Sequence, residues 1–237
     1  GAERVFGLHT AYDLEAGTVG LKPGINNAAV DHFRIRVHGK STHVSTPHLG
    51  VDALYIASQI VVAVQGLVTR RTSPTEPVII GIGKLNAGTT YNAVAAFAEM
   101  EGTTRTISQE SRDRVRAQVS ETAQSIAALY GGTAEIEWTD FAAALVNDPQ
   151  VCEEAARVVD ELLGAGHVVT DRELSLSGDN FAEFELYKPG AYAYLGTGNP
   201  DLPHTMITNH NGGFDVDENA LVTGAGLYVG YTVARLG

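Results

Sequence analysis

The feature that most constrains the fold is an ordered alternation of strand-like and helix-like segments between residues 26 and 142. Residues His32–Val37 alternate apolar and polar side chains, which predicts a strand, and Gly50–Arg70 carries apolar residues at helical spacing. Ser108 is a suitable cap for a second helix, which Gly131-Gly132 would end. Further strands are expected at 78–85, 97–107 and 134–138. The resulting order, βαββαβ, is that of a ferredoxin-like sandwich.

The segments on either side of this region predict an α/β domain. Arg4–His9 is typical of a buried strand that ends in a histidine, and Tyr192–Leu195 predicts a short strand of the same sheet. Helices are expected over Val151–Leu163, after the Asn147-Asp148-Pro149 cap, and over Asp217–Leu236. The expected fold class is therefore α/β, with an inserted ferredoxin-like domain. The expected domain ranges are 1–25 and 143–237 for the interrupted domain and 26–142 for the insert.

Composition excludes several classes of partner. Sixteen basic against 28 acidic side chains give a net charge of −12, whereas nucleic acids and anionic membranes need clustered Lys and Arg. The apolar runs Ile60–Val64 and Val78–Ile82 are shorter than the roughly 18 residues of a membrane span. The one cysteine, Cys152, cannot form an internal disulfide, so we expect a reducing, cytoplasmic setting. Because its helix neighbours are apolar, Cys152 is expected to be a small core residue.

Short motifs alone assign no function. Eight histidines and 28 carboxylates could build a metal site, but HExxH and CxxC do not occur in the sequence. A GxSxG elbow and a GxxxxGK[ST] phosphate loop do not occur either. Six longer strings are more informative, and they occur in this order: Phe6-Gly7-Leu8-His9, Gly39-Lys40-Ser41-Thr42-His43-Val44-Ser45-Thr46-Pro47-His48, Tyr91-Asn92-Ala93-Val94, Glu101-Gly102-Thr103-Thr104-Arg105-Thr106, Ser177-Gly178-Asp179-Asn180-Phe181-Ala182 and His210-Asn211-Gly212-Gly213-Phe214.

Together these strings resemble the dinuclear-metal amidohydrolases of the aminoacylase, hippurate hydrolase and indole-acetyl-amino-acid hydrolase group. The resemblance runs from Val5 to the C-terminus. It implies a metal-dependent amidohydrolase that uses two divalent ions, Zn or Mn, and acts on an N-acyl amino acid or a peptide. It also implies that residues 26–142 are a lid domain, which interrupts the catalytic domain and forms a homodimer.

The resemblance implies metal-ligand roles for two histidines. His9 matches a metal-binding histidine at a strand end, and His210 matches the last ligand of the family, on the loop before the final helix. A buried structural histidine is the alternative for His9, and a solvated loop histidine is the alternative for His210. The neighbouring His204 is not expected to be a ligand.

His43 is the expected catalytic residue of the lid. In the family, the histidine of Gly-Lys-x-x-His reaches the partner subunit's active site, where it polarises the scissile carbonyl. A donor directed at the developing oxyanion is worth a few kcal/mol. The alternative is a surface histidine at the start of a helix, and for His48 a local contact with the backbone is expected instead.

Asn92 and Arg105 match family residues that hold the carboxylate of the substrate. The planar fork of Arg suits a carboxylate, and Asn adds a neutral donor. A turn residue is the alternative for Asn92, and a surface ion pair is the alternative for Arg105. Ala95 replaces a proline usual in this family, so Asn92 is expected to be held less tightly.

Asp179 stands where relatives have a Glu. It is expected either to orient a ligand histidine, by a hydrogen bond to the side of the ring away from the metal, or to cap a helix.

The family takes its other ligands and its general base from residues before the position of His9. Because the chain also opens in mid-strand, we expect the front of the catalytic domain to be missing and the isolated chain to be inactive. Two alternatives remain, a non-catalytic dimerisation or ligand-binding module and a dipeptidase or carboxypeptidase on the same scaffold.

Overall fold

The computed structural model describes residues 1–236, and the chain divides into two compact units. Unit 2 comprises Ala28–Ala144 and Leu176–Gly178, and unit 1 comprises Gly1–Asn27, Leu145–Ser175 and the residues from Asp179 onward. The boundaries of the inserted unit lie two residues from those expected, apart from the short segment Leu176–Gly178, which joins unit 2.

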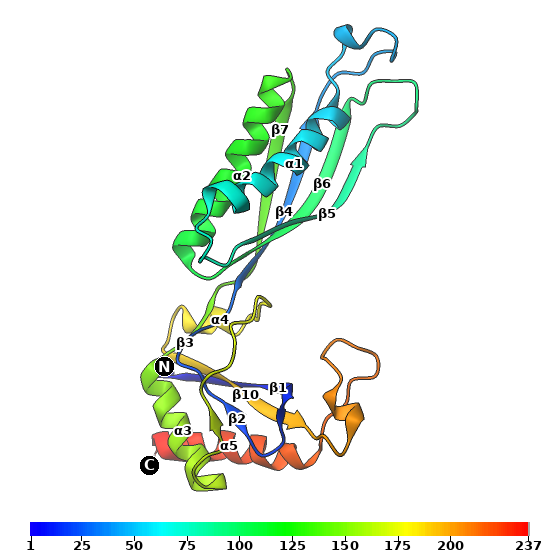
Figure 1. Cartoon of the computed structure of the whole chain (residues 1–237). Helices are drawn as coiled ribbons and strands as arrows, with labels where there is room; N and C mark the ends of the chain where they lie inside the picture. The colour runs from blue at the N-terminus through cyan, green and yellow to red at the C-terminus, as the bar shows by residue number, and fades with distance from the viewer. Residues whose placement is uncertain (237) are drawn as a thin grey trace. The chain divides into compact units, whose positions relative to one another are not determined.

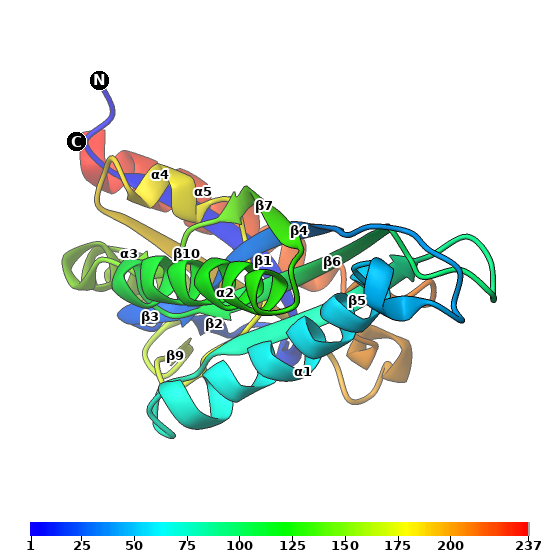
Figure 2. The same cartoon turned by 90° about the horizontal axis from the view of Figure 1, so that it is seen from above.

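Unit 2 is the ferredoxin-like sandwich that the periodicity predicts. Its strands form one antiparallel sheet in the order β5-β6-β4-β7, and two helices cover one face of that sheet (Figure 1). The helices lie side by side when the unit is viewed from above (Figure 2). The elements are β4 (Ala29–His38), α1 (Ala53–Arg71), β5 (Ile79–Ala87), β6 (Phe97–Thr106), α2 (Gln109–Leu129) and β7 (Thr133–Ala142), with a short 3-10 helix, η1 (Pro47–Leu49).

Alternation along β4 decides which face of this sheet is buried. Phe33, Ile35 and Val37 are fully buried against the helices, whereas Arg34 and Arg36 lie between them in sequence and face away. On that outer face Arg36 pairs with Glu99 at 3.1 Å and with Glu137 at 2.7 Å. Charged ladders of this kind keep the uncovered face of an antiparallel sheet in water.

Side-chain caps start both helices of unit 2. Asp52 accepts hydrogen bonds from the backbone N–H groups of Leu54 and Tyr55 at the start of α1. Ser108 accepts one from the N–H of Ser111 at 3.1 Å, as the sequence predicts. Each cap satisfies backbone donors that the helix leaves unpaired and is worth about 1 kcal/mol.

One helix, α1, is long and apolar enough to cross a membrane by length and composition, with a mean hydropathy of 1.3. It is longer than the apolar run Ile60–Val64 within it. In the structure α1 packs on the sheet of unit 2, and its inward residues Ile56, Ile60 and Val64 are fully buried. This packing is that of a core helix.

Unit 1 contains a four-stranded sheet in the order β1-β10-β2-β9 and a separate pair of strands, β3 and β8. Helices α3 and α5 pack against each other, and both bury apolar side chains in one core with β10. The elements are β1 (Val5–Glu15), β2 (Val19–Gly20), β3 (Gly24–Asn27), β8 (Leu145–Asn147), α3 (Pro149–Leu163), β9 (Val168–Val169), α4 (Ala182–Glu185), β10 (Gly190–Gly198), η2 (Pro203–Met206) and α5 (Asn219–Leu236).

Strand β1 corrects one expectation. It pairs in parallel with β10, so the two predicted strands do share a sheet, but it continues to Glu15 instead of ending at His9. His9 pairs with Tyr194 in the interior of the strand. The strand continues because Ala11 still pairs with Gly196, after which the register shifts and Glu15 pairs with Gly198.

Candidate functional site

His43 lies on the exposed loop between β4 and α1. Lys40 and Val51 exchange both backbone hydrogen bonds, at 2.8 and 2.9 Å, and so close the base of this loop. At Gly39, a Cβ atom would lie 2.2 Å from the carbonyl oxygen of Val51, so a side chain there would force the base of the loop apart. A local contact holds the His43 ring, because its Nδ1 lies 2.7 Å from the Ser45 Oγ.

Asn92 lies on the exposed turn between β5 and β6, next to the His43 loop. Val44 donates its backbone N–H to the Asn92 carbonyl at 3.1 Å, and Val94 donates to the Thr42 carbonyl at 2.8 Å. His43 and Asn92, distant in sequence, are therefore carried by two adjacent segments. The carbonyl of Ala95 also accepts the Ala53 N–H at 2.9 Å, which ties the turn to α1 although the family's proline is replaced here.

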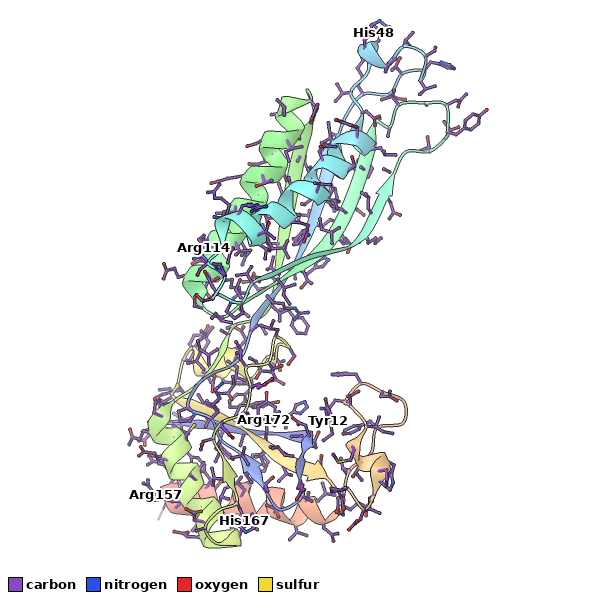
Figure 3. The ribbon with its side chains drawn as sticks, viewed as in Figure 1. Tyr12, His48, Arg114, Arg157, His167 and Arg172 are labelled. Carbon is purple, nitrogen blue, oxygen red and sulfur yellow. The ribbon has the colours of Figure 1, made fainter. Side chains whose placement is uncertain are left out.

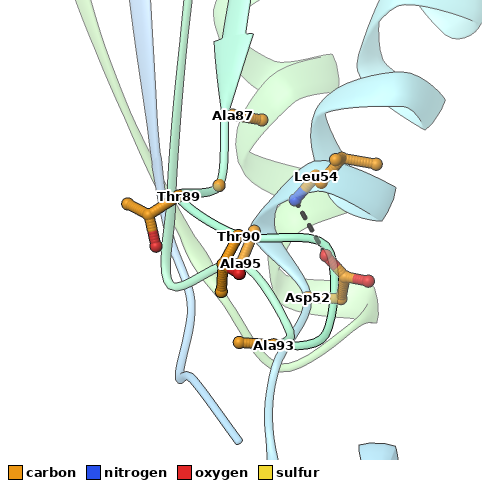
Figure 4. A pocket seen from close by; sticks show the side chains of 8 residues that line it. Asp52, Leu54, Ala87, Thr89, Thr90, Ala93 and Ala95 are labelled. Atoms are coloured by element: carbon orange, nitrogen blue, oxygen red, sulfur yellow. Dashed lines mark hydrogen bonds between the residues drawn. The ribbon is translucent and has the colours of Figure 1, made fainter. Parts of the chain in front are cut away.

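A cavity of about 250 Å³ adjoins this turn (Figure 4). The first turn of α1 forms one wall and the turn after β5 forms the other. Small side chains and backbone dominate the lining, and the carboxylate of Asp52 is engaged in capping α1. The cavity could hold a small, mostly neutral group beside Asn92. Its lining includes Asp52, Leu54, Gly88, Thr90, Ala93 and Ala95.

Arg105 lies at the other end of unit 2. It pairs with Val30, near the start of β4, whereas Asn92 precedes Phe97 at the start of β6. The eight residue-to-residue steps of strand from Phe97 to Arg105 span about 27 Å at roughly 3.4 Å per step. Figure 3 shows the same two ends of the unit, with His48 on the His43 loop at one and Arg114, near the start of α2, towards the other.

Asn92 and Arg105 of one chain are too far apart to hold the same carboxylate, and their role in binding substrate stays a prediction. Within a single chain the strand between them is longer than a small substrate, so both cannot contact the same group. Arg105 is half-buried, and within residues 1–236 its guanidinium has no ion-pair or hydrogen-bond partner. It remains available for an anionic ligand.

His9 is half-buried in β1 of unit 1 and lies between two tyrosines. The ring centroids of Tyr192 and Tyr194 are each 6.1 Å from that of His9. The His9 Nδ1 lies 2.7 Å from the carbonyl oxygen of Thr10, and a carbonyl can only accept. Nδ1 therefore carries the proton, and the lone pair on Nε2 is left for a metal or another donor.

His210 lies on the exposed loop before α5, in a left-handed backbone conformation with a φ of 62°. The side-chain amide of its neighbour Asn209 lies 3.4 Å from the His9 Nδ1, so this loop and the middle of β1 are adjacent. The rejected candidate, His204, is exposed and lies 3.8 Å from Asp215.

Asp179 makes two contacts within unit 1. Its Oδ1 accepts the backbone N–H of Phe181 at 2.8 Å, which is a cap-like bond just before α4. Its Oδ2 accepts the hydroxyl of Tyr192 at 2.7 Å. Burial, and then the Asp179 carboxylate, raise the pKa of Tyr192. Asp179 thus reaches the neighbourhood of His9 through a tyrosine, and its role in orienting a ligand stays a prediction.

The motifs of the sequence do not point to the two tyrosines beside His9. Tyr192 and Tyr194 are two positions apart on β10, so the period of two in a strand places both side chains on the same face. Arg172 covers the ring of Tyr194 with its guanidinium 4.1 Å from the centroid and pairs with Asp13 at 3.0 Å. The alternation Tyr-Ala-Tyr was the available signal, but its importance depends on the pairing of β1 with β10.

Several known proteins are similar to this chain. Residues 28–130 match the M20 family model of a peptidase dimerisation domain. N-acetyl-L-cysteine deacetylase of Bacillus subtilis is 35% identical over 222 residues, which are 94% of this chain and 51% of that protein. Thermostable carboxypeptidase 1 of Saccharolobus solfataricus is 33% identical over 226 residues, 95% of this chain and 56% of that protein. The structure of a dinuclear metal binding peptidase of the M20 family from Bacillus subtilis matches with a TM-score of 0.79 and 30% identity, covering all of this chain and 58% of that one.

The chain contains an M20 peptidase dimerisation domain and is similar along nearly its whole length to M20 hydrolases. This confirms the resemblance seen in the sequence and the fold class, an α/β chain with an inserted lid domain. The chain spans about half the length of the curated M20 relatives that it matches. Unit 2 contains the residues matched by the M20 dimerisation domain.

A dinuclear metal centre of the M20 kind needs more ligands than these residues supply. Within residues 1–236, no three His, Cys, Asp or Glu side chains lie close enough together to hold an ion. His9 and His210 provide two imidazoles at most, whereas a zinc ion takes roughly four ligands. Cys152 is not a further ligand, because it is buried in the core between α3 and the sheet of unit 1, as expected from its sequence neighbours. The described residues alone do not fit a metal pair.

Proposed function

We propose that the protein hydrolyses the amide bond of an N-acyl amino acid in a metal-dependent reaction. The observation that carries this proposal is the alignment with a deacetylase of N-acetyl-L-cysteine along nearly the whole chain. The positions of Arg105, His43 and Asn92 support it, because each offers a donor suited to an anionic or polarised oxygen. Two divalent ions, Zn or Mn, would activate water, with His9 and His210 among their ligands and the remaining ligands supplied from outside the described residues.

Arg105 is the proposed anchor for the substrate's carboxylate. Its guanidinium is half-buried and has no partner within residues 1–236, so it offers a fork of donors in a partly desolvated place. A bidentate pair with a carboxylate would fix the orientation of the amide relative to the catalytic groups. Replacement by lysine would keep the charge but lose the fork.

His43 is the proposed donor to the oxygen of the scissile carbonyl. It stands on an exposed loop whose base is closed by two backbone hydrogen bonds, so the loop can project without unfolding. Asn92 lies on the adjacent turn and would donate to the same end of the substrate. Donors that are already oriented when charge develops contribute directly to lowering the barrier.

A homodimer would bring these groups together. Because about 27 Å of strand separates Arg105 from the His43 and Asn92 end, one substrate would contact Arg105 of its own chain and His43 and Asn92 of the partner. The match to a dimerisation domain supports this arrangement.

A reducing, cytoplasmic setting is also proposed, on the grounds that the single cysteine is unpaired and buried.

Two further readings are supported by particular observations. Similarity to a carboxypeptidase supports a dipeptidase or carboxypeptidase, which would use the same carboxylate grip. The absence of a three-ligand cluster within residues 1–236 supports a non-catalytic dimerisation or ligand-binding module. The amidohydrolase and the peptidase differ in the bond that the protein would cleave, and the module would cleave none.

Metal content and turnover, measured together, test the proposal. The protein is loaded with Zn or Mn, its metal stoichiometry is measured by elemental mass spectrometry, and it is assayed on N-acetyl amino acids and on unblocked dipeptides. When the remaining metal ligands are supplied together with this chain, we expect about two ions per site and preferential release of acetate. Preferential cleavage of dipeptides would favour the peptidase, and no bound metal with no turnover would favour the module.

A further inference from the structure

The imidazole of His43 is held in a defined protonation pattern by the residue two positions later. The backbone N–H of Ser45 donates to the His43 Nδ1 at 3.2 Å, and the Ser45 Oγ lies 2.7 Å from the same atom. A backbone N–H can only donate, so Nδ1 must be the acceptor. The Ser45 hydroxyl can then donate to Nδ1 as well, and the ring proton of neutral His43 is left on Nε2.

The neighbouring Asn92 shows the same division between donor and acceptor atoms. Thr90 donates its hydroxyl to the Asn92 Oδ1 at 3.2 Å, which occupies an acceptor site of the amide. The amide NH₂ of Asn92 remains unbonded within residues 1–236, and the residue is exposed. Two adjacent side chains therefore present N–H groups outward while their acceptor atoms are engaged by local hydroxyls.

Rigid backbone contacts keep the His43 and Ser45 pair in this geometry. Thr46 donates its backbone N–H to the His43 carbonyl at 2.9 Å, which closes a tight turn around Ser45. The side chains of Thr42 and Thr46 lie 3.1 Å apart across the same turn. Because the turn is fixed by the backbone, the Ser45 hydroxyl is presented to Nδ1 without the entropy cost of ordering a loop.

We propose that Ser45 is a positioning residue, which fixes His43 in the tautomer that carries its proton on Nε2. In that form the outward nitrogen is a donor, suited to a carbonyl oxygen that gains negative charge. With the opposite tautomer the outward nitrogen would be an acceptor and would repel such an oxygen. The catalytic meaning of this assignment rests on the proposed function, but the tautomer itself does not.

Nitrogen NMR of the histidine side chains tests the assignment without any substrate. The protein is labelled with ¹⁵N and measured at about pH 8.5, where an imidazole is neutral. We expect His43 to show a protonated Nε2 and an unprotonated Nδ1. In Ser45→Ala the ratio of the two tautomers should shift about fivefold towards the Nδ1–H form, as expected for one lost hydrogen bond.

Two variants serve as controls for the NMR experiment. Ser41→Ala removes an exposed hydroxyl from the same loop and should leave the His43 signals unchanged. Ser45→Thr keeps a hydroxyl and should restore the wild-type ratio. An Nδ1–H signal for His43 in the wild type, or an unchanged ratio in Ser45→Ala, would overturn the assignment.

Turnover then separates this inference from the proposed function. In an active preparation, Ser45→Ala should lower kcat about fivefold with little change in KM, and Ser45→Thr should recover the loss. A preparation that shows the expected tautomer but no hydrolysis of any N-acyl amino acid would contradict the proposed function and leave the tautomer assignment standing. A normal kcat in Ser45→Ala, with a shifted tautomer ratio, would show that the hydroxyl does not position His43 for turnover.

Discussion

Asp31 and Arg112 form a buried ion pair that joins β4 to α2 across 81 positions of sequence. The Arg112 Nη2 donates to the Asp31 Oδ1 at 2.6 Å, and its Nε donates to Oδ2 at 3.0 Å. The side chain of Arg112 is only 6% exposed and that of Asp31 only 1%. A charge this deeply buried depends on its partner, because the protein interior solvates it poorly.

Arg112→Met should therefore destabilise unit 2 by about 3 kcal/mol, since Asp31 would lose its bidentate partner while staying buried. The measurement is urea unfolding followed by the fluorescence of Trp138, the one tryptophan of the chain, which packs on Phe33 in unit 2. Arg71→Met, at the exposed end of α1, is the matched control and should change stability by less than about 0.5 kcal/mol. Equal stabilities for the two variants would contradict the assigned role of Arg112.

The half-buried carboxylate of Glu185 should make the stability of unit 1 depend on pH. Burial raises its pKa to about 7, with a further contribution from nearby Asp148, although the N–H of Val146 donates to its carboxylate at 2.9 Å. Its second oxygen, Oε1, is buried and has no hydrogen-bond partner in the part of the chain that the structure describes. Between the unfolded pKa of about 4.5 and the folded value the native state binds more protons, so stability falls as the pH rises through this window.

Glu185→Gln should remove most of this slope and stabilise the region by about 2 kcal/mol above pH 7. Hydrogen exchange of the segments around β8 and α4, compared at pH 5 and pH 8, is the measurement. Glu183→Gln, at an exposed position of the same short helix, is the control and should keep the wild-type slope. If Glu185→Gln keeps that slope as well, the carboxylate is not the source of the pH dependence.

Mixing of inactive variants tests the proposed sharing of a site between two chains. His43→Ala and Arg105→Ala should each lower kcat/KM by two or more orders of magnitude, because each removes a donor that the substrate needs. Co-refolded in equal amounts they should recover about a quarter of the wild-type rate, since half of the dimers are mixed and each mixed dimer keeps one intact site.

Controls for the mixing experiment come from the same regions. His48→Ala, on the same exposed loop as His43, should retain near-normal activity alone. A mixture of His43→Ala with Asn92→Ala should recover nothing, because both changes lie at the same end of unit 2. Recovery in that second mixture, or none in the first, would contradict the arrangement.

The thiol of Cys152 should be unreactive towards alkylating reagents in the folded protein. Burial, followed by the charge of Asp148, raises the pKa of its thiol to about 12, and only the thiolate reacts with alkylating reagents. Mass spectrometry after iodoacetamide treatment at pH 8 should find an unmodified chain, and treatment in denaturant should find one added group. Rapid modification of the native protein would show that α3 does not cover this residue.

The strands and helices of unit 2 were largely predictable, because each has a clear period and a local signal at its ends. Ser108 caps α2 as its sequence position indicates, and the six expected elements all occur in order. The short strands of unit 1 were not predictable. Segments such as Val19–Gly20 and Val168–Val169 are too brief for a period and form only because β10 and β2 are available as pairing partners.

The sequence by itself determined the order of elements in unit 2, the cap of α2 and the resemblance to a family, because periodicity, capping chemistry and ordered motifs are local properties of the chain. Only the tertiary structure decided where the candidate residues lie. Pairing of β1 with β10 placed His9 inside a strand between two tyrosines, and the closed loop base placed His43 beside Asn92. The length of β6 separated Asn92 from Arg105, because an extended strand holds its two ends apart. Their closeness in sequence therefore does not make them close in space.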